Sequence, residues 1–75
     1  MLTEKIERHD KFRDAAVRRV RNVETTLRRV RNLSNPNSYA YTEEEIDHIF
    51  NHLQQVLDRT RESFIRPLDR GGFTL

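Results

Sequence analysis

The sequence predicts an all-α protein, a two-helix antiparallel hairpin that dimerises into a four-helix bundle. Three observations lead to this prediction. Two long segments carry apolar residues at helical spacing, a short cluster of turn-forming residues separates them, and the 75 residues include only two glycines and two prolines. The expected domain organisation is a helical hairpin over residues 1–66, followed by a C-terminal tail over residues 67–75.

The first helix is expected over about residues 3–33, because that range contains no glycine or proline. Apolar residues recur there in alternating steps of three and four, which is the heptad spacing of a bundle helix. His9 and Arg13 interrupt the same seam, and Thr3 is placed to act as the N-cap. The predicted core residues of this helix are Leu2, Ile6, Val20, Val23, Leu27 and Val30.

A loop is expected over about residues 34–41, where the run Ser-Asn-Pro-Asn-Ser combines residues typical of turns. The second helix is expected over about residues 42–66. It begins with a capping box, in which Thr42 and Glu45 each bond the other's backbone N–H. It ends before Pro67, which lacks the N–H that a helix uses. The predicted core residues of this helix are Ile46, Ile49, Phe50, Leu53, Val56, Leu57 and Phe64.

The unequal lengths of the two predicted helices favour a homodimer. At about 1.5 Å per residue the first helix is about 46 Å long and the second about 36 Å. Leu2 and Ile6 therefore overhang the shorter helix. A two-fold dimer would cover this overhang and the outer half of each apolar stripe. The alternative cover is the tail, which holds Leu68, Phe73 and Leu75 and a turn signal at residues 69–72.

Charge is unevenly distributed between the two halves of the chain. Residues 1–33 carry ten cations and five anions, and residues 34–75 carry four cations and seven anions, so net charges of +5 and −3 sum to +2. The planar guanidinium of arginine suits phosphate, and a row of arginines binds a nucleic-acid backbone. The alternative function is therefore a nucleic-acid-binding dimer, whereas the ordinary interpretation of such a row is a solvated outer face. The residues of this alternative site are Arg18, Arg21, Arg28 and Arg29.

His48 and His52 are the weak candidates for a metal site. They lie four residues apart on the second predicted helix, a spacing that places two imidazoles on one metal. No third or fourth ligand is evident beside them, and Ile49 stands where the metalloprotease helix motif requires glutamate. We therefore predict no metal site and no other cofactor.

The remaining composition excludes several functions. The chain has no cysteine, which excludes a disulfide framework and a thiolate nucleophile. No apolar run approaches the roughly 18 residues of a membrane span, and the first residues lack an apolar signal-peptide core, so we expect a cytoplasmic protein with no membrane partner. No serine has an orienting histidine and aspartate, and a hairpin has little concavity for a small-molecule substrate. The sequence favours a non-catalytic, self-associating protein-interaction module, with a second copy and a larger protein as its partners.

Overall fold

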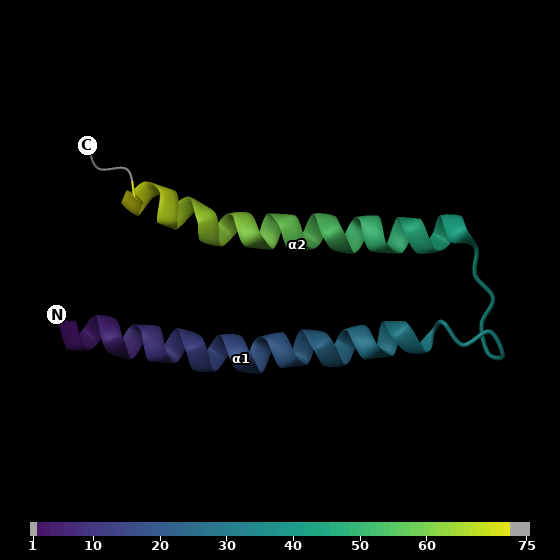
Figure 1. Cartoon of the computed structure of the whole chain (residues 1–75), viewed down its shortest axis with the longest axis horizontal. Coiled ribbons are helices and arrows are strands. Elements are labelled where there is room, and N and C mark those ends of the chain that lie inside the picture. The colour runs from purple at the N-terminus through teal and green to yellow at the C-terminus, as the bar shows by residue number, and fades with distance from the viewer. Residues whose placement is uncertain (1, 73–75) are drawn as a thin grey trace. The chain divides into compact units, whose positions relative to one another are not determined.

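The protein is all-helical over the residues that its structure describes. A computed structural model describes the backbone of residues 2–72 and the side chains of residues 2–67. In that range it contains two helices and no strand, α1 (Leu2–Asn32) and α2 (Glu43–Gly72), as Figure 1 labels them. The chain divides between Tyr39 and Ala40 into two compact units, one for each helix. The prediction of an all-α chain with two long helices is confirmed.

α1 begins one residue earlier than predicted. The helix already includes Leu2, so Thr3 lies inside its first turn and the prediction of Thr3 as the N-cap is wrong. At the other end the helix tightens before it stops: the N–H of Leu33 donates to the Val30 carbonyl over 3.0 Å, and the N–H of Ser34 donates to the Arg31 carbonyl over 3.0 Å. Such i→i−3 bonds satisfy carbonyls that a helix end leaves without partners.

The connector, residues 33–42, is organised around Asn35. The Asn35 side-chain Oδ1 accepts the N–H of Asn37 over 3.1 Å, which is an Asx turn across Pro36. The Asn35 carbonyl also accepts the N–H of Ser38 over 3.2 Å and that of Tyr39 over 3.0 Å. Pro36 fixes its own φ and offers no N–H, so the chain turns here instead of extending α1.

The predicted capping box forms at the start of α2. The Glu45 N–H donates to Thr42 Oγ1 over 3.1 Å, and the Thr42 N–H donates to Glu45 Oε1 over 2.9 Å. The Thr42 hydroxyl also donates to the same carboxylate over 3.0 Å. Glu43, Glu44 and Glu45 all lie in the first turn, where negative charge interacts favourably with the helix dipole.

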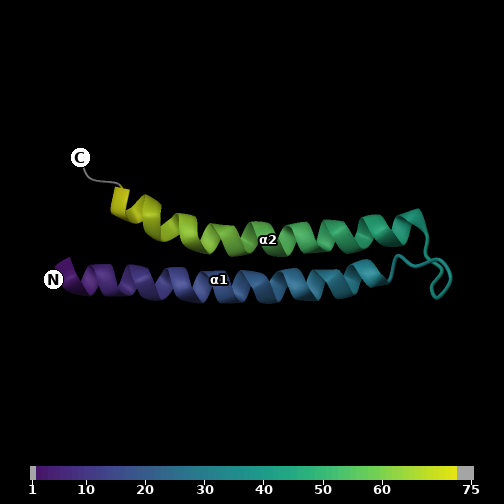
Figure 2. The same cartoon turned by 60° about the horizontal axis from the view of Figure 1, so that its bottom comes forward.

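The end of α2 differs from the prediction. The helix continues through Pro67 to Gly72, so the predicted end at residue 66 and the predicted turn at residues 69–72 are both wrong. The ribbon of α2 bends where its colour passes from green to yellow (Figures 1 and 2). Pro67 has no N–H for the Ser63 carbonyl and its ring crowds that carbonyl, and both effects kink a helix that continues through a proline. Residues 73–75, the rest of the predicted tail, lie outside the described residues.

Over residues 2–67, neither unit has an interior of its own. None of the side chains described over residues 2–67 is buried. The least exposed are only intermediate, namely Ala15, Ala16, Val30, Ile46 and Leu53. A single helix cannot enclose a side chain, so the apolar residues of each helix stay on its surface. The functional question is therefore which of these surfaces is a binding site.

Candidate interaction surfaces

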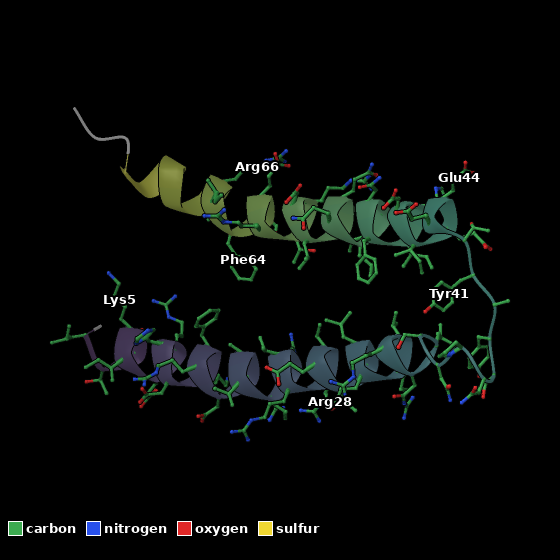
Figure 3. The ribbon with its side chains drawn as sticks, turned by 45° about the vertical axis from the view of Figure 1, so that its right-hand side comes forward. Lys5, Arg28, Tyr41, Glu44, Phe64 and Arg66 are labelled. Carbon is green, nitrogen blue, oxygen red and sulfur yellow. The ribbon has the colours of Figure 1, made fainter. Side chains whose placement is uncertain are left out.

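The apolar face of α2 is the larger of two apolar surfaces. Its residues fall within an arc of about 120° when each residue advances the helix by about 100°. Leu57 is 59% exposed and Phe50 is 53% exposed, although both are large apolar side chains. In Figure 3 Phe64 projects from one side of α2, and Glu44 projects from the opposite side. The α2 apolar face consists of Ile46, Ile49, Phe50, Leu53, Val56, Leu57 and Phe64.

Not every apolar residue of α2 lies on this face. Ile65 lies about 120° from the centre of this face and about 100° from Phe64, the preceding residue. Ile65 and Ile49 are nevertheless almost equally exposed, at 38% and 37%. The two isoleucines therefore differ in face and not in accessibility within their own helix.

The apolar face of α1 spans a similar arc of about 120° but is interrupted along the helix. It consists of the predicted core residues Leu2, Ile6, Val20, Val23, Leu27 and Val30. Val20 is 56% exposed and Leu27 is 44% exposed. His9 and Arg13 are both exposed and occupy the stretch between the two ends of the face. The continuous part is thus the C-terminal part, from Val20 to Val30, with Ala16 beside it.

The arginine face of α1 lies opposite its apolar face. It consists of Arg18, Arg21, Arg28 and Arg29, all exposed. These residues occupy an arc of about 100° and extend along the helix for about 16 Å. Figure 3 shows Arg28 and Lys5 projecting from different sides of α1. Thr25 lies between the arginines, and its hydroxyl donates to the Arg21 carbonyl over 3.0 Å.

Charge is segregated within each helix, not only between the two. Residues 2–14 hold four cations and four anions, whereas residues 15–32 hold six cations and one anion, a net +5. Residues 43–58 hold five anions and no cation, a net −5, and residues 59–72 hold four cations and two anions, a net +2. Net charges summed over each half of the chain do not show this segregation. Net charges summed over each half of a helix show it from the sequence alone.

The charges of the balanced segment, residues 2–14, are arranged for mutual screening. Glu4 precedes Arg8, and Glu7 precedes Lys11, each by one helical turn. This is the orientation in which oppositely charged pairs stabilise a helix. The same four side chains line an open hollow on the surface of α1. On the arginine face Asp14 precedes Arg18 and Glu24 precedes Arg28 in the same way, but Arg29 has no anion within one turn of it.

The two candidate metal ligands remain a pair. His48 and His52 are both exposed on the polar side of α2. Over the part of the chain that the structure describes, no group of three or more His, Cys, Asp or Glu side chains could hold a metal ion. Glu44 and Glu45 lie one turn earlier, and Glu45 is engaged by Thr42.

Comparisons with known proteins assign no family to the chain. No family model matches it, and no curated protein and no solved structure matches it either. Within the described residues, neither helix combines the length and the apolar character that crossing a membrane requires. The assignment of function therefore depends on the surfaces of α1 and α2 themselves.

Proposed function

We propose that this chain is a self-associating helical module that binds protein through its apolar faces and has no catalytic activity. In this proposal α1 and α2 pair as an antiparallel hairpin, and two hairpins form a four-helix bundle. The observation that carries the proposal is the α2 apolar face, which is continuous along the helix. Its central residues, Ile49 and Leu53, are not buried within their own unit.

Energetics favour covering this face. Fully burying an aliphatic or aromatic side chain contributes roughly 1.5–3 kcal/mol. An isolated helix in water is marginally stable, because most helix stability in proteins comes from packing an apolar face. The mean hydropathy of the chain is low, at −0.89, so few other residues are available to stabilise it. With no disulfide and few apolar residues outside these faces, association of the apolar faces is the main source of stability available to the chain.

The connector favours an antiparallel order of the two helices. Residues 33–42 join α1 to α2, and ten residues reach at most about 36 Å when fully extended. A parallel pairing along the whole of α2 would require a return of about 45 Å, the length of its 30 residues. A connector of this length is ordinary for antiparallel neighbours.

Charge favours the same order. The cationic half of α1, residues 15–32, and the acidic half of α2, residues 43–58, both adjoin the connector. An antiparallel pairing sets these halves side by side, whereas a parallel one would set each beside a segment of weaker or like charge. Arg19 and Arg31 flank the α1 apolar face. Residues that flank the apolar seam of paired helices form salt bridges between the helices, so these two arginines are the cations best placed to pair with the acidic half.

A second copy covers what one hairpin leaves exposed. An arc of about 120° on α2 is wider than the seam of a two-helix contact, and matches a helix with more than one neighbour. Two-fold pairing supplies that neighbour by presenting the same surface twice. A larger protein with a complementary apolar groove would occupy the same face in place of the second copy.

A matched pair of isoleucine variants tests the proposal. Ile49→Ala removes a side chain from the α2 apolar face, and Ile65→Ala removes the same side chain, equally exposed, from another side of the helix. We expect Ile49→Ala to weaken the dimer by at least tenfold in dissociation constant and Ile65→Ala to change it by less than about threefold, because only the first loses buried area. Sedimentation equilibrium measures both constants. Equal effects of the two substitutions would show that the α2 apolar face is not the interface.

A further inference from the structure

We infer that the arginine face of α1 binds the phosphate backbone of double-stranded nucleic acid without reading its sequence. The face is a second surface, separate from the apolar faces used in self-association. The inference therefore stands or falls independently of the proposed function. It starts from four exposed arginines, Arg18, Arg21, Arg28 and Arg29, on one side of one helix.

The arginine face has fewer carboxylates than arginines. Asp14 precedes Arg18 by one helical turn, and Glu24, the one anion of residues 15–32, precedes Arg28 by one turn. Arg29 has no anion within one turn of it. In the same helix the segment 2–14 balances every cation with an anion, whereas residues 15–32 carry a net +5. The arginine face therefore keeps an excess of positive charge that its own helix does not neutralise.

The dimensions of the face fit a duplex. Its arginines extend over about 16 Å of helix axis. Double-stranded DNA carries one negative charge for each ~1.7 Å of its axis, so a surface of this length meets several phosphates at once. Guanidinium groups also match phosphate oxygens with two parallel N–H donors, which a lysine ammonium does not.

Besides its four arginines, the arc of this face carries only two polar side chains over residues 15–32, Thr25 and Asn32. Thr25 lies among the arginines, but its hydroxyl already donates to the Arg21 carbonyl. Contacts from arginine to phosphate position a protein on a duplex and carry no sequence information. The expected binding is therefore independent of sequence and strongly dependent on salt.

Self-association leaves the arginine face accessible. The centre of the face lies about 130° from Val20 and about 170° from Val23 around the helix. Arg19 and Arg31, which flank the apolar face, are the cations that the acidic half of α2 would meet. The four arginines of the face would remain in solvent in a hairpin or a bundle.

Two quadruple variants with the same net charge test the inference. R18Q/R21Q/R28Q/R29Q removes the arginine face, and K5Q/R8Q/K11Q/R13Q removes four cations from the balanced half of α1. Each lowers the formal charge of the chain from +2 by four, to −2. Binding is measured by fluorescence anisotropy with a labelled 20-base-pair DNA duplex, and circular dichroism shows whether each variant keeps its helices.

The wild-type chain is expected to bind the duplex at low salt, with log K falling against log[salt] at a slope of about −3.6 per chain for four phosphates. The arginine-face variant should bind at least about a hundredfold more weakly and lose most of that slope, because it lacks the neutralising groups. The control should stay within about tenfold of the wild type, since it keeps every phosphate contact. A four-lysine version of the arginine face should retain the slope, which separates loss of charge from loss of fold.

Three results would overturn the inference. The first is no binding by the wild-type chain at about 50 mM salt, where phosphate contacts are strong. The second is an equal loss of affinity in both glutamine variants, which would mean that net charge alone matters. The third is competition by polyglutamate at the same charge concentration as the duplex, which would identify an acidic protein as the partner.

Discussion

Thr42 and Glu45 exchange hydrogen bonds across the first turn of α2, with the Glu45 N–H on Thr42 Oγ1 at 3.1 Å and the Thr42 N–H on Glu45 Oε1 at 2.9 Å. We expect Thr42→Ala to lower the free energy of unfolding by about 1 kcal/mol, because it leaves a backbone donor without its acceptor. Urea unfolding followed by circular dichroism measures the change.

Two other threonine substitutions are the controls for this cap. Thr42→Ser keeps a hydroxyl and should lie within about 0.5 kcal/mol of the wild type. Thr25→Ala removes a hydroxyl that donates to the Arg21 carbonyl inside α1, which caps no helix end. An equal loss from Thr25→Ala and Thr42→Ala would show that the capping box contributes nothing particular.

Leu53 lies at the centre of the α2 apolar face and is one of the least exposed side chains of the helix. In the proposed bundle Leu53→Ala should lower the free energy of unfolding by about 2–5 kcal/mol, as removal of a buried leucine does. Gln54→Ala, on the polar side, should change it by less than about 0.5 kcal/mol. Unfolding curves for Leu53→Ala that overlie those of the wild type would place Leu53 outside any core.

Pro67 lies inside α2, and the ribbon of α2 bends in its green-to-yellow part (Figure 2). Pro67→Ala should restore an N–H donor for the Ser63 carbonyl and relieve up to about 3 kcal/mol of local penalty. The expected result is a larger helical signal at 222 nm. Pro36→Ala, in the connector, is the matched control and should leave the signal nearly unchanged. A helical signal that Pro67→Ala does not raise would contradict a kinked helix at this point.

His48 and His52 form a pair without further ligands in the described part of the chain. We expect the protein to retain less than about 0.1 equivalent of zinc after chelation and dialysis, because structural zinc sites use four protein ligands. Elemental analysis gives the stoichiometry, and His48→Ala/His52→Ala should melt at the same temperature as the wild type. One retained equivalent of zinc that this double variant loses would reverse the conclusion.

Local signals predicted the helices well where their causes are local. The start of α2 follows from Thr42 and Glu45, which lie three residues apart and satisfy each other without any distant contact. The connector follows from Asn35 and Pro36 in the same way. The end of α2 differs from the prediction because a proline within a helix removes one hydrogen-bond donor and bends the helix without necessarily ending it.

The surfaces were predicted to a different extent. Helical periodicity placed the arginines and the apolar residues on opposite sides of α1, since the side of a helix depends only on spacing. The pairing of the faces depends on side chains from separate units, which periodicity along one helix does not encode. The cationic half of α1 and the acidic half of α2 can be read from the sequence. They become visible only when charge is summed within the bounds of each helix.

Self-association through the apolar faces is the central claim, and molar mass in solution tests it most directly. Light scattering from the wild-type chain across a range of concentrations should give twice the 9.0 kDa of one chain, with the helical signal falling as dilution dissociates the dimer. A chain that stays at 9.0 kDa at every concentration and unfolds cooperatively would contradict the claim.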